Sequence, residues 1–283
     1  MRIAIASGKG GTGKTTLAVN LALYAAEFEP VLLMDLDVEE PNGSIFVEGE
    51  VQSETAIYRN VPQWDQGACT LCGKCTSWCA YNALLKLGDT ILVMPNLCHS
   101  CFACSELCPV QALPMIQESM GKLLHLQRGK LNFVETKLDI GLEQASPLIA
   151  ESLRFADKHF QNTGMQILDS PPGTACAMIS AVKTADFVVL ISEPTPFGLH
   201  DLKLAVETIR QLNIPFGVVV NRDGIGNDDI YEYIQQEDIV LLARIPHQRR
   251  IAELYSQGRL LYKEVEEIRT ALQNILGYAK ELR

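Results

Sequence analysis

The sequence predicts an α/β protein with a mostly parallel sheet, interrupted by a small cysteine-rich domain. Apolar runs of strand length alternate with helix-length stretches along most of the chain, and a glycine-rich turn follows the first run. Eight of the nine cysteines lie between Cys69 and Cys108, where this alternation fails. Continuous apolar strands separated by helices are typical of parallel sheets that are covered on both faces.

The first strand is expected at residues 2–7, before a glycine-rich loop at 8–13, a helix at 14–27 and a second strand at 31–35. Further apolar runs of strand length lie at 165–169, 187–192, 216–221 and 239–245. Helix-length stretches alternate with them at 175–184, 198–212, 228–236 and 248–257. Charges of both signs interleaved with Val, Ile and Leu predict a last amphipathic helix within 262–282.

The main domain is expected at residues 1–61 and 119–283, with a small α+β domain inserted at 62–118. Within the insert, 91–93 and 113–116 are expected to form a little sheet. After the insert, 123–127 and 130–137 flank Arg128-Gly129 and predict a β-hairpin. Ser146-Pro147 predicts the start of a helix that runs to 160, because proline suits the first helical position.

Composition narrows the classes of function. The chain is 47% hydrophobic, which is typical of a globular protein with a substantial core. Its formal net charge of −10 argues against nucleic acid as the main partner, because phosphate binding needs a concentrated basic surface. No apolar run approaches the roughly 20 residues of a membrane-spanning helix, and residues 1–7 are too short for a signal sequence. We therefore expect a cytoplasmic protein, in which clustered cysteines are not structural disulfides.

A complete phosphate-loop motif, G-x4-G-K-T, runs from Gly8 to Thr15. Its glycines let successive backbone N–H groups turn towards phosphate oxygens, with help from the following helix N-terminus. Lys14 is expected to reach the β- and γ-phosphates, and the Thr15 hydroxyl to bind Mg²⁺. A glycine turn without a ligand is the alternative, but the strand before it and the helix after it favour nucleotide binding. The expected binding residues are Gly8, Lys9, Gly10, Gly11, Thr12, Gly13, Lys14, Thr15 and Thr16.

The run K-G-G-T-G-K-T-T from Lys9 to Thr16 resembles the deviant Walker A motif of the superfamily that contains nitrogenase iron protein, MinD, ParA and the Mrp-type iron–sulfur carriers. In that superfamily the early lysine reaches across a dimer to the partner's nucleotide. The resemblance therefore implies catalytic roles for Lys9 and Lys14, and a nucleotide-dependent homodimer or a heterodimer with a related subunit. A solvated loop lysine is the alternative for Lys9. The resemblance covers 1–40 and 146–260 and implies a P-loop NTPase domain that binds ATP, although the sequence alone does not exclude GTP.

Two acidic segments resemble the switch regions of the same superfamily. In Leu33-Met34-Asp35-Leu36-Asp37 the resemblance implies that Asp37 orients or deprotonates the attacking water and that Asp35 supports the metal. In the segment 167–173 it implies that Asp169 holds Mg²⁺ through water and that the Gly173 N–H senses the γ-phosphate. A carboxylate at the end of a buried strand is costly without a partner, which favours a functional reading.

Two later segments resemble the part of the site that holds the base. Val220-Asn221-Arg222 resembles the base-binding turn, so the resemblance implies that Asn221 and Arg222 contact the nucleotide. Ile245-Pro246 resembles the loop that closes over the adenine, which implies a contact from Pro246.

The cysteines form two copies of C-x2-C-x2-C-x3-C, at 69–79 and 98–108. This is the bacterial ferredoxin arrangement, in which the fourth cysteine of each run binds the other cluster. Zinc is the alternative, but a third cysteine at the same short spacing favours a [4Fe-4S] cluster. Ala80 follows Cys79 where proline follows Cys108, so the turn after Cys79 is less constrained. The expected ligands are Cys69, Cys72, Cys75 and Cys108 for one cluster, and Cys98, Cys101, Cys104 and Cys79 for the other.

Cys176 stands apart from the others, seven residues after Asp169. A cysteine at that offset binds a bridging cluster in nitrogenase iron protein, but that cluster needs a second cysteine, which Gln144-Ala145-Ser146 does not supply. We therefore expect a buried core cysteine, with a partial ligand of a transient cluster as the alternative. The aromatic side chains among the other cysteines are expected to pack around the clusters: Trp78, Tyr81, His99 and Phe102.

Three functions follow from these motifs. The first is a Mg²⁺-dependent ATPase that couples nucleotide state to electron transfer through two [4Fe-4S] clusters, with an unidentified redox partner. The second is an ATP-dependent iron–sulfur carrier or scaffold that delivers clusters to an acceptor protein. The third is a MinD/ParA-like spatial regulator. The whole chain resembles MinD-like ATPases with an inserted ferredoxin, and Ser192–Asp201 resembles a segment shared within that group, although a strand-to-helix connection explains its Pro and Gly equally well.

Overall fold

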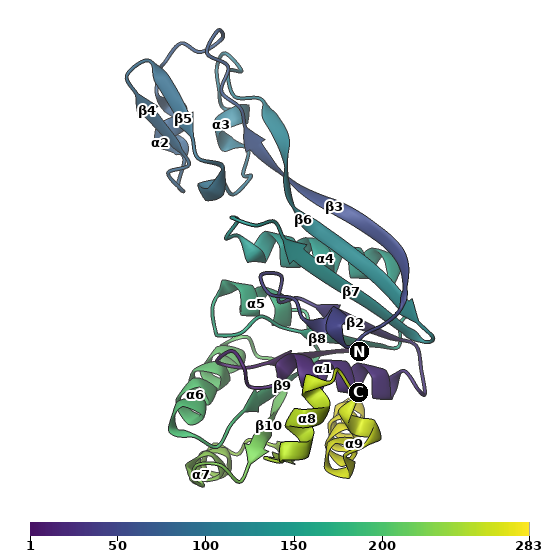
Figure 1. Ribbon diagram of the computed structural model, residues 1–283. Helices are drawn as coiled ribbons and strands as arrows, with labels where there is room; N and C mark the ends of the chain where they lie inside the picture. Colours follow the sequence, from purple (N-terminus) through teal and green to yellow (C-terminus); the bar gives the residue numbers. More distant parts are fainter. Residues whose placement is uncertain (283) are drawn as a thin grey trace. The chain divides into compact units, whose positions relative to one another are not determined.

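The computed structural model describes residues 1–282, and the chain divides into two compact units (Figure 1). The first unit comprises residues 1–55, 123–137 and those from 145 on, and the second comprises 56–122 and 138–144. The insert expected at 62–118 falls within the second unit. Its identity as a ferredoxin-like domain stays a prediction.

Within residues 1–282 the strands form one nine-stranded and one two-stranded sheet. The order in the large sheet is β11-β10-β9-β1-β8-β2-β7-β6-β3. Pairing is parallel from β11 through β7, which confirms the predicted mostly parallel α/β fold. The strands are β1 (Arg2–Ala6), β2 (Val31–Asp35), β3 (Glu50–Pro62), β6 (Met115–Arg128), β7 (Leu131–Leu138), β8 (Met165–Asp169), β9 (Phe187–Ser192), β10 (Phe216–Asp223) and β11 (Leu241–Pro246).

Helices cover both faces of the parallel strands in the first unit. Figure 1 shows α1, α8 and α9 on one face and α5 and α6 on the other. Alternate strand residues such as Ile3 and Ile5 join α1 and α9 in one buried cluster, because successive strand side chains point to opposite faces. The helices are α1 (Lys14–Ala25), α4 (Ala145–His159), α5 (Cys176–Val182), α6 (Pro196–Gln211), α7 (Asp229–Gln236), α8 (Arg249–Ser256) and α9 (Glu266–Glu281).

The parallel register brings together the strand ends that carry the predicted acidic site residues. Asp35 of β2 pairs with Asp169 of β8, and Ile5 of β1 pairs with Asp169 on the other side. The loop after β1 therefore lies at the same edge of the sheet as both acidic residues. Ligands of open parallel sheets bind at this carboxyl edge.

The second unit contains a two-stranded sheet of β4 (Leu84–Leu87) and β5 (Thr90–Val93), and two short helices, α2 (Lys74–Trp78) and α3 (Ala103–Glu106). The expectation that residues 113–116 pair in this little sheet is wrong. β5 pairs with β4 instead, and Met115 begins β6 of the large sheet. The hairpin predicted at 123–137 is confirmed, although β6 begins eight residues earlier than expected (123 − 115).

Candidate functional site

The loop between β1 and α1 needs glycine at two contacts. A Cβ at Gly13, whose φ is +101°, would lie 2.6 Å from the Asn221 Nδ2 atom. A Cβ at Gly8 would lie 2.2 Å from the Asp201 carbonyl oxygen of α6. The loop is therefore packed between α6 and the end of β10, and it turns directly into α1.

A cavity of about 580 Å³ opens beside this loop. That volume suits a small-molecule ligand, since such sites typically enclose roughly 300–1,000 Å³. Its wall includes residues of the loop and Asp37, and also the apolar side chains of Ile245, Ile251 and Leu261. A wall that combines a glycine loop with apolar side chains suits the phosphates and the base of a nucleotide. The predicted site residues on the wall are Gly10, Gly11, Gly13, Lys14, Thr15, Thr16, Asp37, Asn221, Arg222 and Pro246.

Lys14 is buried at the start of α1. Its Nζ donates to the Ser7 Oγ at 3.0 Å and to the Lys9 carbonyl oxygen at 3.4 Å. Burial lowers the pKa of Lys14, while the nearby Asp169 and Asp37 oppose that change. An ammonium group held inside the loop in this way can neutralise a phosphate without first losing a bulk-water shell.

Asp169 is a buried carboxylate without a hydrogen bond of normal geometry to either oxygen. Burial raises its pKa well above the usual range, the neighbouring Asp35 raises it further, and Thr15 and Lys14 act in the opposite direction. A buried unpaired carboxylate is costly unless a cation joins it. Asp169 together with the Thr15 hydroxyl therefore fits a hard divalent cation such as Mg²⁺, which prefers oxygen ligands.

Asp35 and Asp37 differ in their surroundings. The Asp35 carboxylate accepts backbone hydrogen bonds from Asp37 (3.1 Å), Asn42 (3.0 Å) and Gly43 (2.8 Å). Burial raises the pKa of Asp35 to about 6 despite these bonds. Asp37 is half-buried and lines the cavity, and burial raises its pKa while Lys14 lowers it. Asp35 thus braces the segment that presents Asp37 to the cavity.

Two of the predicted nucleotide contacts, Gly173 and Asn221, already bond to the phosphate loop. The Gly173 N–H donates to the Ser7 carbonyl oxygen at 3.1 Å. The Asn221 side chain donates to the Thr12 carbonyl oxygen at 2.7 Å and accepts from the Arg222 N–H at 2.9 Å. Asn221 therefore braces the phosphate loop here, and its contact with a base stays a prediction.

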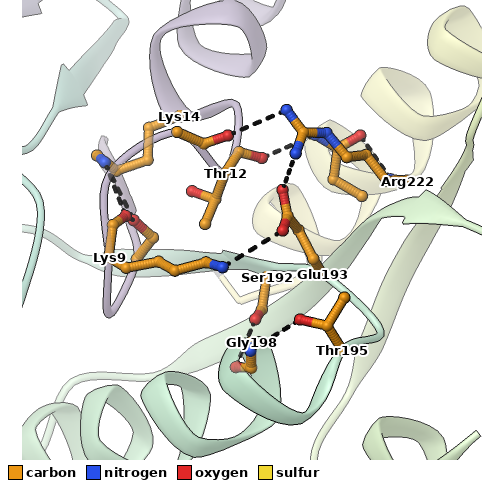
Figure 2. Close-up of polar contacts among 11 residues, drawn as sticks. Lys9, Thr12, Lys14, Ser192, Glu193, Thr195, Gly198 and Arg222 are labelled. Atoms are coloured by element: carbon orange, nitrogen blue, oxygen red, sulfur yellow. Dashed lines mark hydrogen bonds and ion pairs between the residues drawn. The ribbon is translucent and has the colours of Figure 1, made fainter. Parts of the chain in front are cut away.

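Glu193 is a site residue that the sequence did not single out. Figure 2 shows its buried carboxylate between Lys9 and Arg222. The Lys9 Nζ lies 3.4 Å from one carboxylate oxygen and the Arg222 Nη1 lies 2.6 Å from the other. The Arg222 contact lacks hydrogen-bond geometry at that oxygen, so it is an ion pair in character. A glutamate directly after a buried strand was the available signal.

The eight clustered cysteines line two small cavities in the second unit. Cys69, Cys72, Cys75 and Cys108 line the first. Cys98, Cys101, Cys104 and Cys79 line the second. Each cavity therefore combines three cysteines of one run with the last cysteine of the other. Within residues 1–282, no group of three or more His, Cys, Asp or Glu residues is arranged to hold a single metal ion.

The two cysteine runs repeat in backbone conformation with a 29-residue offset. Positive φ values occur at Leu71 and Ser100, at Gly73 and Phe102, and at Asn82 and Gln111. Backbone N–H groups also approach the sulfur atoms in matching pairs. Those of Leu71 and Ser100 approach Cys69 and Cys98, at 3.4 and 3.5 Å, and those of Ala83 and Ala112 approach Cys79 and Cys108, both at 3.3 Å. Such contacts stabilise negative charge on sulfur.

Cys176 is exposed, so the expectation of a buried core cysteine is wrong. It is the first residue of α5, and the buried side chains of that helix begin two residues later at Met178.

The predicted last helix is confirmed as a packed surface helix, because Ile268, Leu272 and Ile275 of α9 are buried. No helix within residues 1–282 is both long enough and apolar enough to cross a membrane.

Known proteins resemble the chain along nearly its whole length. Residues 3–261 match the CobQ/CobB/MinD/ParA nucleotide binding domain. An uncharacterised protein of Methanocaldococcus jannaschii is 30% identical over 280 residues, covering 98% of this chain and 97% of its own. An iron-sulfur cluster carrier protein of Aquifex aeolicus is 23% identical, covering 90% of this chain and 60% of its own. The cell division ATPase MinD of Pyrococcus furiosus has the same fold, with a TM-score of 0.58, 17% identity and 98% of each chain covered.

Proposed function

Because the chain belongs to the CobQ/CobB/MinD/ParA nucleotide-binding family, we propose that it hydrolyses ATP with Mg²⁺ and couples the nucleotide state to electron transfer through two [4Fe-4S] clusters. The observation that supports this most directly is the pairing of two kinds of site in one chain. A phosphate loop borders a cavity of nucleotide size, and eight cysteines line two further cavities in sets of four.

In the first unit, each side chain has a task that follows from its position. The glycine-loop N–H groups and Lys14 bind the phosphates. Asp169 and Thr15 hold Mg²⁺, which offsets negative charge on the phosphates. Asp37, half-buried beside Lys14, orients the attacking water, and Asp35 fixes the backbone around Asp37 through its three backbone hydrogen bonds.

In the second unit, the cysteine thiolates hold the clusters. Soft thiolate ligands suit iron–sulfur clusters, and the crossed fourth cysteine matches the ferredoxin arrangement. The clusters supply one-electron chemistry when bound. The chain itself contributes the matching N–H groups near sulfur and half-exposed aromatic side chains, Trp78 beside the first cavity and Tyr81 and Phe102 beside the second.

A second candidate is an ATP-dependent iron–sulfur carrier that delivers clusters to an acceptor protein. The similarity to an iron-sulfur cluster carrier protein supports it, and so does the exposure of Cys72 and Cys101, since an exposed ligand is open to exchange. The buried or half-buried setting of the other six clustered cysteines favours retention, and therefore electron transfer. A nucleotide-dependent dimer and a cytoplasmic location belong to the same proposal, and a spatial-regulator role is the weakest candidate.

The test is anaerobic purification, followed by iron and sulfide analysis and an EPR-monitored redox titration with and without a non-hydrolysable ATP analogue and Mg²⁺. Eight irons per chain and midpoint potentials that shift on nucleotide binding support electron transfer. Loss of clusters to an apo-acceptor protein with ATP supports the carrier. Lys14→Ala is the control, because it should keep its iron and lose the nucleotide-induced shift. A chain without iron contradicts the proposal. So does a chain in which nucleotide changes neither the midpoint potentials nor the transfer of clusters to the acceptor protein.

A further inference from the structure

The segment Ser192–Asp201 contains a buried carboxylate that faces two cations at the phosphate loop. Glu193 is 5% exposed. Its partners Lys9 and Arg222 are partly open to solvent, with 32% and 48% of their side chains exposed. Arg222 also donates to the Gly11 carbonyl oxygen at 3.4 Å and lines the large cavity. One buried anion therefore pairs with both Lys9 and Arg222 beside the phosphate loop (Figure 2).

The backbone around Glu193 is held on several sides. A Cβ at Gly198 would lie 2.2 Å from the Glu193 carbonyl oxygen, and the Ser192 hydroxyl donates to the Gly198 carbonyl oxygen at 2.8 Å. A Cβ at Gly226 would lie 1.8 Å from the Pro194 carbonyl oxygen. The start of α6 and the loop after β10 thus fix Glu193 beside the phosphate loop. Within this segment, Gly198 and Pro194 therefore have a positioning role beyond joining a strand to a helix.

We infer that Glu193 is a positioning residue that competes with the nucleotide's phosphates for Lys9 and Arg222, so that a bound triphosphate takes both cations from it. This inference rests on the proposed nucleotide-binding function. A triphosphate carries several negative charges, so a carboxylate close to it opposes its binding. This opposition is smaller only where the two anions share the attraction of the same cations. The competition grows with the number of phosphates, so Glu193 discriminates between nucleotides by charge.

The first experiment measures binding of a non-hydrolysable ATP analogue with Mg²⁺, and of AMP, by isothermal titration calorimetry. Glu193→Gln keeps the shape of the side chain and removes its charge. We expect this variant to bind the triphosphate about threefold to tenfold more tightly, with less than about a twofold change for AMP. Glu207→Gln is the matched control, because Glu207 is exposed on α6 and its replacement makes the same change in net charge. Its triphosphate affinity should equal that of the unaltered chain.

Two further variants separate competition from a merely structural role. Glu193→Asp keeps the charge but is shorter by one methylene, so it should lose the 3.4 Å contact to Lys9 and show part of the gain. In a Lys9→Gln background, the gain from Glu193→Gln should shrink, because one of the contested cations is absent. Unchanged or weaker triphosphate binding in folded Glu193→Gln and Glu193→Asp overturns the inference. An unaltered chain that does not bind the analogue at all contradicts the proposed function instead.

Discussion

At the scale of single residues, the buried acidic side chains of the nucleotide site lower the stability of the free protein when they are ionised. Asp169 has no hydrogen bond of normal geometry at either oxygen and lies near Asp35. Burial raises the pKa of both groups, so the folded chain binds protons at these positions more readily than the unfolded chain does. Their ionised forms therefore destabilise the free protein above the raised pKa values. For Asp35 this cost falls as the pH drops from about 6 towards the ordinary range of aspartate, and for Asp169 it falls in the same direction.

The substitution Asp169→Asn should stabilise the nucleotide-free protein by about 1–3 kcal/mol at pH 8, because it removes an unpaired buried charge. The gain should shrink as the pH falls towards about 4, where the wild-type carboxyl groups are protonated. Urea unfolding at several pH values measures both effects. Asp89→Asn, at an exposed turn, is the control and should change little. A variant that is less stable at pH 8 would mean that the Asp169 carboxylate has a favourable partner.

Single residues also show which contacts of the site could not be predicted from the sequence. The grouping of Lys14, Asp37 and Asp169 follows from strand ends and a loop motif, which sequence patterns report well. The side-chain partners of Asn221 and Glu193 depend on the approach of β10 and β9 to the phosphate loop, which no local pattern encodes. The burial of Cys176 was predicted wrongly, because a small apolar residue next to a helix start can face either the core or the solvent.

At the scale of secondary-structure elements, the buried parallel strands were predictable and the polar strand β3 was not. β2, β8 and β9 have the predicted limits, since each is a continuous apolar run. Most residues of β3 between Glu50 and Ala56 are exposed and polar, so the hydrophobic signal there is weak. Pairing with β6 supplies the stability that the local sequence lacks, and pairing is a tertiary contact.

The connection from β9 to α6 depends on close contact with the loop after β10. Gly226→Ala should destabilise the protein by about 2–4 kcal/mol, because φ is +73° and the new Cβ would lie 1.8 Å from the Pro194 carbonyl oxygen. Gly224→Ala is a matched control in the same loop. Its φ is +98°, but no atom lies within 4 Å of the new Cβ, so only the backbone cost of about 1 kcal/mol applies. Equal losses of stability in the two variants, measured by urea unfolding, would show that the contact with Pro194 is unimportant.

β3 and β6 are also joined by an ion pair in the second unit. Arg59 is buried, and its Nε and Nη2 donate to Glu118 at 3.0 and 2.7 Å. Glu118→Ala should cost about 2–3 kcal/mol of stability, because it leaves a buried guanidinium without its anion. Glu237→Ala breaks the Arg210–Glu237 pair, in which both side chains are exposed, and should cost less than about 1 kcal/mol. Similar losses of stability in the two variants, measured by urea unfolding, would contradict this prediction. They would mean that Arg59 is in contact with water in solution.

At the scale of the whole molecule, the two units differ in how their cores are built. The first unit has a large apolar cluster in which β1, α1 and α9 take part. The described core clusters of the second unit are small. Val61, Ala83 and Cys98 form one, and Leu84, Ile91 and Leu113 form another, with several of the predicted cluster ligands packed against them. A unit of this size with so little apolar burial usually needs disulfides or metal for stability.

Removal of iron should therefore unfold the second unit selectively. We expect anaerobic chelation to abolish slow amide exchange in residues 56–122, while the strands β1, β2, β8 and β9 stay protected and the ATP analogue still binds. In the function that we propose, thiolate–iron bonds replace the apolar contacts that this unit lacks, whereas the first unit has its own core. Hydrogen-exchange mass spectrometry of the iron-loaded and chelated chain measures the effect. Cys176→Ser is the control, because Cys176 belongs to neither set of four, so its exchange pattern and iron content should match those of the unaltered chain. Persistent protection of residues 56–122 after complete iron removal would show that apolar packing alone suffices there.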